Sequence, residues 1–118
     1  MKLLIIDDEK SLLKLLQMSL ADAQTEVLVA ETGSSGLELA ARDTFDSIIC
    51  DIGLPDLDGL EVLRRLKAQR PETPVIMITA HGTVASALSA MKSGAYDYVP
   101  KPFEPEELKL VVQRALHE

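Results

Sequence analysis

The sequence predicts one α/β domain: a doubly wound fold with a five-stranded parallel sheet between layers of helices. Five short apolar runs recur along the chain, and amphipathic helical patterns separate them. Most of the runs are continuously apolar rather than alternating, which is typical of strands buried on both faces of a parallel sheet. Regular alternation of strands and helices with short connections favours the doubly wound architecture.

The expected strands are the runs 3–6 (LLII), 27–30 (VLVA), 48–50 (IIC), 75–78 (VIMI) and the weaker 96–99 (YDYV). Right-handed crossovers leave few topologies. The flavodoxin-like order 2-1-3-4-5 suits a chain of five strands. Ligands of such sheets bind at the carboxyl ends of the strands where the order reverses, which places a site at the ends of the runs 3–6 and 48–50.

Apolar residues at helical spacing mark the expected helices, and such stripes ordinarily face the core. The stripes are Leu13, Leu16 and Leu20; Leu60, Leu63 and Leu66; Val84, Leu88 and Met91; and Leu108, Val111, Val112 and Ala115. Start and stop signals agree with them. These signals are the capping-box pairs Ser35 with Glu38 and Asp58 with Glu61, Pro105 at a first helical position, and Gly94 in the turn after the fourth helix.

Composition limits the functional class. A chain of 118 residues with 47% hydrophobic and 26% charged residues suits one globular domain, 1–118, with no linker or repeat. The net charge of -7 argues against direct nucleic-acid binding, because phosphates would be repelled. No apolar stretch approaches the length of a membrane helix, and Asp7 and Asp8 end the N-terminal apolar run too early for a signal peptide. With the single Cys50, these features predict a cytoplasmic protein without disulfides.

Polar side chains follow four of the five expected strands. Asp7 and Asp8 follow the first strand, Asp51 the third, Thr79 the fourth, and Lys101 the fifth. If the first and third strands are neighbours, three carboxylates converge, and a cation is needed to keep all of them ionised. Carboxylate oxygens of this kind suit Mg²⁺.

Each residue alone has an ordinary explanation. An Asp after a strand is often the N-cap of the next helix, Thr79 alone would be a strand residue, and Lys101 alone a surface lysine. The four strand ends agree with one another, however, and this agreement favours a shared site.

Together with their spacing, these segments resemble the receiver domain of bacterial two-component response regulators. The resemblance covers the whole chain. It rests on LLIIDDE at the end of the first strand, DIGLPDLDG from Asp51, VIMITAHG at the fourth strand, and SGAYDYVPKPF from Ser93 to Phe103.

The resemblance implies that Asp51 accepts a phosphoryl group from a sensor histidine kinase. It also implies a bound Mg²⁺ or Mn²⁺ held by Asp8 directly, by Asp7 partly through water, by Asp51 and by the backbone carbonyl of Gly53. Thr79 and Lys101 would contact phosphoryl oxygens, and the Lys101–Pro102 bond would be cis. Such a domain is a switch rather than an enzyme.

The resemblance further implies an output mechanism. Tyr98 matches the family's switch aromatic, which moves toward Thr79 and changes the face formed by segments 84–91, 96–99 and 108–115. An ordinary half-buried strand aromatic is the alternative. Tyr96 is expected on the same side as Tyr98 by strand alternation, so the assignment depends on the spacing to Lys101.

Five residues have other interpretations. Cys50 is expected to point away from the site into the core, and Phe103 to anchor its loop in the core. His117 is expected at a solvated helix end. His81 and Gly53 lie near the expected approach of water to the phosphoryl group, and no phosphate lifetime follows from them.

The stretch from Met77 to Phe103 looks closest to receivers of nitrogen-regulator-type transcriptional activators. We therefore expect a DNA-binding and ATPase output domain beyond Glu118, and a homodimer through the face formed by segments 84–91, 96–99 and 108–115. The cognate kinase, signal and regulated genes do not follow from the sequence.

Two other functions share part of this pattern. A haloacid-dehalogenase-like phosphatase also uses an Asp nucleophile and Mg²⁺, but its nucleophile lies on the first strand in a DxD motif, whereas Gly53 stands two residues after Asp51. A receiver-like module that is never phosphorylated would ordinarily have lost one of the site residues, and none is lost here.

Overall fold

Five strands alternate with five helices in residues 1–117, which are the part of the chain that this computed structural model describes. The elements are β1 (Lys2–Ile6), α1 (Lys10–Leu20), β2 (Glu26–Ala30), α2 (Gly33–Arg42), β3 (Ser47–Asp51), α3 (Gly59–Gln69), β4 (Val75–Thr79), α4 (Val84–Lys92), β5 (Asp97–Pro100) and α5 (Pro105–Leu116). All strands are parallel, in the order β2-β1-β3-β4-β5. The predicted fold class and strand order are confirmed.

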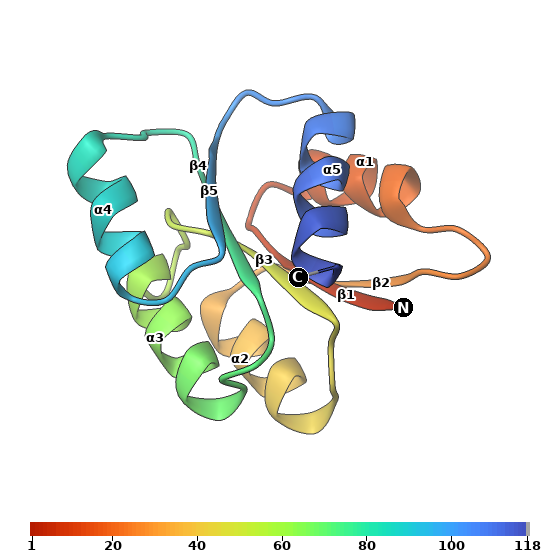
Figure 1. The fold of residues 1–118 in the computed structure, drawn as a ribbon, viewed down its shortest axis with the longest axis horizontal. Helices are drawn as coiled ribbons and strands as arrows, with labels where there is room; N and C mark the ends of the chain where they lie inside the picture. Colours follow the sequence, from red (N-terminus) through yellow and green to blue (C-terminus); the bar gives the residue numbers. More distant parts are fainter. Residues whose placement is uncertain (118) are drawn as a thin grey trace.

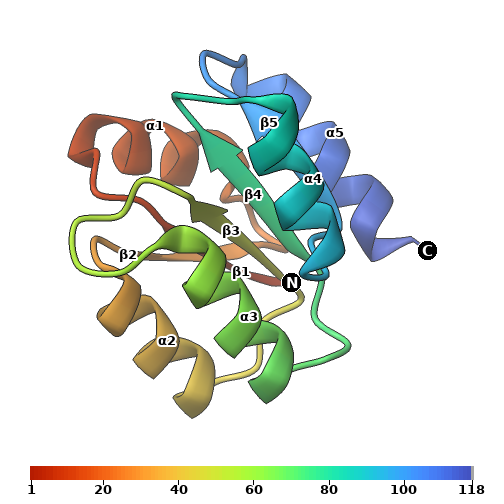
Figure 2. The same cartoon turned by 90° about the vertical axis from the view of Figure 1, so that its left-hand side faces the viewer.

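The helices form one layer on each side of the sheet (Figures 1 and 2). Helices α1 and α5 pack together on one face, and α2, α3 and α4 cover the other. Each layer encloses its own apolar core, because side chains of a buried strand point alternately to the two faces. Leu3 and Ile5 lie in the α1/α5 core, while Leu4 and Ile6 lie in the core under α2 and α3. No helix of residues 1–117 is long and apolar enough to cross a bilayer.

The central strands explain the continuously apolar runs. β3 and β4 are buried at every position, whereas the edge strands β2 and β5 are only partly buried. The register pairs Ile6 with Cys50 and Asp51 with Ile78. The residues that follow β1 and end β3 and β4 therefore emerge at one edge of the sheet.

Helix ends follow the predicted signals only in part. Pro105 begins α5 and Gly94, with φ of 102°, follows α4, as expected. The pair Ser35 with Glu38 is wrong: α2 begins three residues earlier, where Thr32 and Ser35 form the capping box.

The second predicted capping box is only half formed. Asp58 is the N-cap of α3 and accepts a hydrogen bond from the Leu60 amide. The Glu61 side chain accepts no hydrogen bond from the Asp58 amide; its carboxylate instead pairs with Arg64 and Arg65 on the exposed face of the helix.

The predicted burial of the α4 stripe is also wrong. Val84, Leu88 and Met91 are 78%, 55% and 47% exposed, and Ala90 is the buried residue of this helix. A helix of small residues packs closely through Ala90, so its larger apolar side chains point to solvent. Helical spacing alone does not reveal which stripe faces the sheet.

The fifth strand begins one residue later than predicted, at Asp97. Tyr96 therefore precedes the strand and packs against the α1/α5 core, whereas Tyr98 packs against the core under α2 and α3. The expectation that both tyrosines lie on one side is wrong, because strand alternation does not extend to Tyr96.

Candidate functional site

Three carboxylates meet at the carboxyl edge of the sheet. Asp7 and Asp8 follow β1, and Asp51 ends β3, the strand that pairs directly with β1. One carboxylate oxygen from each lies within 4.8 Å of the other two. Asp7 is fully buried and Asp51 nearly so, while Asp8 is exposed. The predicted convergence of the ends of β1 and β3 is therefore confirmed.

Lys101 extends into this cluster from the end of β5. Its ammonium Nζ donates to Asp7 Oδ2 at 2.8 Å and to Asp51 Oδ2 at 3.4 Å. Its backbone amide donates to the Thr79 carbonyl at 2.7 Å, and the Lys101–Pro102 bond is cis, as predicted. The side chain is therefore fixed from both ends in a position that places one positive charge between two carboxylates.

The surroundings of Asp51 disfavour its charge. Burial, followed by the neighbouring Asp7 carboxylate, raises the pKa of Asp51, and hydrogen bonds from Gly53 and Lys101 offset this in part. The Gly53 amide donates to Asp51 Oδ1 at 3.2 Å, which leaves Oδ2 on the side of Lys101. The two oxygens of the carboxylate thus have different partners.

The charge of Lys101 is stabilised. Burial alone would lower the pKa of its ammonium group, but the hydrogen bond and charge of Asp7, together with the charge of Asp51, outweigh that effect and raise the pKa. Three carboxylates against one ammonium leave a formal charge of -2 when all are ionised. A divalent cation would neutralise that charge.

Thr79 ends β4 beside β3, with its side chain buried. Its hydroxyl Oγ1 accepts a hydrogen bond from the His81 amide at 3.1 Å. The His81 side chain is exposed. Thr79 therefore brings a hydroxyl to the same sheet edge as Asp51, and His81 lies in the loop that leaves this edge.

Tyr98 connects β5 to α4. Its hydroxyl lies 2.8 Å from the Ser86 hydroxyl, and Ser86 forms the capping box of α4 with Thr83. A Cβ added at Gly82 would lie 3.1 Å from the Tyr98 hydroxyl and 3.5 Å from Thr79 Cγ2. Tyr98 and Thr79 thus border the same short loop.

The structure bears out the expected places of Cys50, Phe103 and His117. Cys50 is fully buried within the core under α2 and α3, and that burial, followed by the charge of Asp51, raises the pKa of its thiol. Phe103 is half-buried and packs against the α1/α5 core. His117 is exposed at the end of α5.

Three contacting residues were missed. Glu9 Oε2 lies 3.6 Å from the Lys101 ammonium, Ser86 meets Tyr98, and Asp56 binds the start of α2. Glu9 directly follows the acidic pair, so position in the sequence could have indicated it. The other two contacts join segments far apart in the chain, and no sequence pattern signals them.

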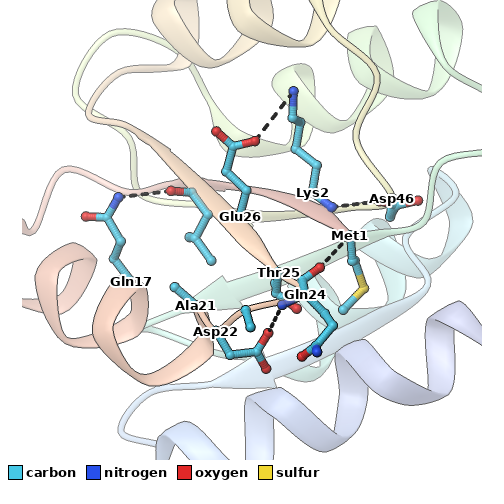
Figure 3. Close-up of a pocket in the computed structure, with 11 residues that line it drawn as sticks. Met1, Lys2, Gln17, Ala21, Asp22, Gln24, Thr25, Glu26 and Asp46 are labelled. Atoms are coloured by element: carbon cyan, nitrogen blue, oxygen red, sulfur yellow. Dashed lines mark hydrogen bonds and ion pairs between the residues drawn. The ribbon is translucent and has the colours of Figure 1, made fainter.

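A hollow at the opposite edge of the sheet does not compete with this site. It measures about 630 Å³, against about 410 Å³ for the one beside Lys101 and Phe103. In Figure 3 its polar groups pair with each other: the Lys2 amide with Asp46, and the Gln17 side chain with the Val27 carbonyl. Its lining includes Lys2, Asp22, Glu26 and Asp46. Among residues 1–117, however, the acidic side chains close enough to share a metal ion are Asp7, Asp8 and Asp51 at the carboxyl edge.

The residues at the carboxyl edge fit a divalent ion such as Mg²⁺. Hard carboxylate oxygens come from two adjacent strands, and the exposed Asp8 leaves that side of the cluster open to water, which Mg²⁺ ordinarily retains. Gly53 is exposed, and no heavy atom lies within 4 Å of the Cβ position that this residue lacks. Its backbone is therefore accessible beside Asp51.

Comparison with known proteins agrees with this geometry. The chain is 39% identical to the regulatory protein AtoC of Escherichia coli (strain K12) over 115 residues, which are 98% of this chain and 25% of AtoC. It is 39% identical to the DNA-binding transcriptional regulator NtrC of the same strain over 112 residues, 95% of this chain and 24% of NtrC. The chain thus spans about a quarter of the length of each of these relatives.

Solved structures match over nearly the whole chain. A CheY-like receiver domain from Methanospirillum hungatei JF-1 superimposes with a TM-score of 0.94 at 29% identity, covering 98% of this chain and 93% of that one. The beryllofluoride-activated NtrC4 receiver domain dimer gives 0.92 at 32% identity, covering 98% and 96%. Residues 3–113 match the family described as response regulator receiver domain. This chain therefore belongs to the response regulator receiver domains of two-component systems, which are phosphoacceptor switches rather than catalysts and act with histidine kinases.

Proposed function

We propose that this chain accepts a phosphoryl group from a sensor histidine kinase onto Asp51, in a reaction that depends on Mg²⁺, and that the modification alters the face formed by α4, β5 and α5. The observation that carries the proposal is the meeting of Asp7, Asp8 and Asp51 with the Lys101 ammonium at one sheet edge. A carboxylate nucleophile, a cation and an acidic metal site are what an acyl-phosphate switch requires.

Asp51 would act as the nucleophile. One of its oxygens forms the new bond to phosphorus while the phosphorus–nitrogen bond of a phosphohistidine breaks, and the imidazole nitrogen keeps the electron pair of that bond. Lys101 offsets in part the burial and the Asp7 charge that raise the pKa of Asp51, and so favours the charged form that acts as the nucleophile. The transfer needs alignment and charge neutralisation more than covalent help from the protein.

Asp8, Asp7, Asp51 and the Gly53 carbonyl would hold Mg²⁺, and Mn²⁺ would suit the same ligands. When bound, the ion neutralises charge on the transferred group. Lys101 would pair with one phosphoryl oxygen, and the Thr79 hydroxyl, which accepts from the His81 amide, would donate its own proton to another. Thr79 would thus report whether Asp51 carries phosphate.

Tyr98 would transmit the change at Thr79 to α4. Its hydroxyl is bonded to Ser86 in the capping box of α4, beside the loop that also borders Thr79. Replacement of a carboxylate by a dianionic phosphoryl group is a local charge change that can bias such an element between two positions. The exposed apolar side chains of α4 would then serve an output contact, such as a homodimer through the α4-β5-α5 face.

We further infer that residues 1–118 form the receiver part of a longer transcriptional regulator. AtoC and NtrC are about four times as long as the matched segment, and NtrC is a DNA-binding transcriptional regulator. A DNA-binding and ATPase output domain, rather than this acidic segment, would contact nucleic acid. Family membership also supports a cytoplasmic location.

Acetyl phosphate with Mg²⁺ tests the proposal directly. The purified domain should gain the mass of one phosphoryl group, the gain should require the divalent ion, and Asp51→Asn should abolish it. Asp58→Asn is the matched control, because Asp58 caps α3 at the end of the same loop and Asn caps helices equally well. Retention of the label by Asp51→Asn would falsify the assignment of the phosphoacceptor.

Two more variants separate acceptance from output. Lys101→Ala and Thr79→Ala should still accept some phosphate, because the nucleophile and acidic pair remain, but should fail to change the α4-β5-α5 face. Amide chemical shifts of α4 and β5 before and after phosphorylation measure this. If both phosphorylated variants showed the same chemical-shift changes as the wild type, Lys101 and Thr79 would not link phosphorylation to the α4-β5-α5 face.

A further inference from the structure

The loop between β3 and α3 carries Gly53, the residue whose carbonyl is proposed to bind the metal. The β3 end of the loop is fixed, since the Ile52 amide donates to the Ile78 carbonyl of β4 at 2.9 Å. Its α3 end folds back on this point, with the Gly59 amide donating to the Ile52 carbonyl at 2.9 Å. The intervening residues depend on other contacts.

Asp56 supplies such a contact, and its partner is α2 rather than the site. Its Oδ1 accepts from the Gly33 amide at 2.8 Å and its Oδ2 from the Ser34 amide at 3.0 Å. Hydrogen bonds from Ser34 and then Gly33 lower the pKa of the Asp56 carboxyl to about 2, so it is ionised at any physiological pH.

This contact completes the start of α2. The first amides of a helix have no partner within the helix. Thr32 satisfies one of those in α2, since its side chain accepts from the Ser35 amide, while its carbonyl accepts the first regular helical bond, from Gly36. The Gly33 and Ser34 amides, which precede Ser35 in the helix, both donate hydrogen bonds to Asp56. The negative charge of Asp56 also suits the positive end of the helix dipole.

Apolar packing holds the same junction. A Cβ added at Gly33 would lie 3.2 Å from Cβ and Cδ1 of Leu57 and 2.9 Å from Val62 Cγ2. The absence of a side chain at Gly33 therefore lets the loop lie directly against α2. The segment Asp56–Leu57 is docked on the helix by both hydrogen bonds and contact.

We propose that Asp56 is a positioning residue for the metal: by fixing the middle of the loop to α2, it holds the Gly53 carbonyl beside Asp51 before the ion arrives. This rests on the proposed metal-dependent function. Without the anchor, binding of the ion would have to order the loop, and the entropy lost would weaken the affinity.

A matched pair of substitutions in one loop tests this. Asp56→Asn and Asp58→Asn both remove one negative charge, but only the first disturbs the bonds to α2, because the Asn amide group can no longer accept from both backbone amides. We expect Asp56→Asn to weaken Mg²⁺ binding by about threefold to tenfold relative to Asp58→Asn, somewhat less than substitutions directly behind a metal ligand. An NMR titration with Mg²⁺ measures the affinity of each variant from the signals of the folded protein alone.

A second measurement uses the wild-type chain. Coupling between two sites is reciprocal, so saturating Mg²⁺ should slow hydrogen exchange at the Gly33 and Ser34 amides more than at Ser35 and Gly36. The proposal would be wrong if the two Asn variants had equal Mg²⁺ affinities, or if Mg²⁺ did not change hydrogen exchange at Gly33 and Ser34. Asp56 would then act only as a cap of α2. Absence of Mg²⁺ binding in the wild type would instead overturn the proposed function itself.

Discussion

The carboxylate of Asp51 is buried at the end of β3, beside that of Asp7 and within reach of a single ammonium group. Burial raises its pKa above the ordinary 3.8, with the charge of Asp7 as the next cause. Between the ordinary and the raised pKa, the folded chain binds more protons than the unfolded chain. Stability therefore falls as the pH rises through this window.

Asp51→Asn should remove the loss of stability that ionisation of Asp51 causes as the pH rises. In metal-free buffer at neutral pH, we expect the variant to have a higher free energy of unfolding than the wild type, by on the order of 1 kcal/mol. The difference should shrink as the pH falls from neutral through the raised pKa of Asp51 toward the ordinary 3.8, because protonation then neutralises Asp51 in the wild type. Urea unfolding with a chelator across this pH range measures it, with Asp58→Asn as the control for a lost charge. Parallel pH profiles of wild type and Asp51→Asn would contradict the prediction.

Gly53, in the loop after β3, and Gly59, at the start of α3, should respond oppositely to alanine. A Cβ at Gly59 would lie 2.3 Å from Ile52 Cα and 2.4 Å from the Asp51 carbonyl oxygen, and this backbone cannot yield without moving the end of β3. We expect Gly59→Ala to cost roughly 1–3 kcal/mol of unfolding free energy. At Gly53 no heavy atom lies within 4 Å, so Gly53→Ala should be neutral or stabilise by about 0.4–1 kcal/mol. Denaturant unfolding measures both changes. An equal loss of stability in the two variants would argue against the close approach of Gly59 to the Asp51–Ile52 backbone.

Among the helices of residues 1–117, α4 has the fewest buried residues. Ala90 is its buried residue, whereas α3 buries Val62, Leu63 and Leu66. Its N-terminus is held by a hydrogen bond between Ser86 and Tyr98. Elements with little buried apolar surface open and shift most easily, which suits α4 to the proposed movement after phosphorylation.

The Ser86–Tyr98 bond should be measurable by a double-mutant cycle. Ser86→Ala and Tyr98→Phe each remove this bond, so the double variant should lose less stability than the sum of the single losses. We expect a coupling free energy of about 0.5–1.5 kcal/mol. Ser89→Ala, the same substitution at an exposed position of α4, should show no coupling to Tyr98→Phe. Additive losses at Ser86 and Tyr98 would show that the two hydroxyls do not act together.

At the scale of the whole molecule, the parts predicted from the sequence are those set by short-range pattern. Continuous apolar runs located four of the five strands, and the weaker run 96–99 located the fifth to within one residue. The order of the parallel sheet then brought Asp7, Asp8 and Asp51 together. The outward stripe of α4 was not predicted, because periodicity gives the spacing of a face and not its direction. The side of Tyr96 was mistaken because a strand boundary moved by one residue.

Contacts between segments far apart in the chain could not be predicted from the sequence. Asp56 lies 23 residues from Gly33 and 22 from Ser34, and Ser86 lies 12 residues from Tyr98. Nothing in either local sequence distinguishes these side chains from ordinary loop and cap residues. Only the packed fold brings them to their partners, so a sequence argument reaches the acidic cluster but not the contacts that position it.

The exposed apolar side chains of α4 lead to a prediction about assembly. The similar NtrC4 receiver domain forms a dimer in its beryllofluoride-activated form. We expect acetyl phosphate with Mg²⁺ to shift this chain from monomer toward dimer, and Leu88→Gln to weaken that dimer roughly tenfold or more, since a buried Leu contributes about 1.5–3 kcal/mol. Stability of the unphosphorylated monomer should change by less than about 0.5 kcal/mol, because Leu88 is already exposed.

Leu15→Gln provides the matched control, since Leu15 is similarly exposed, at 49% against 55%, but lies on α1, on the opposite face of the sheet. Sedimentation velocity before and after phosphorylation distinguishes the two variants. Loss of dimer in Leu88→Gln alone places the contact on α4. Loss in Leu15→Gln alone would move it to α1, and a wild type that stays monomeric when fully phosphorylated would leave the α4 face to serve a different partner.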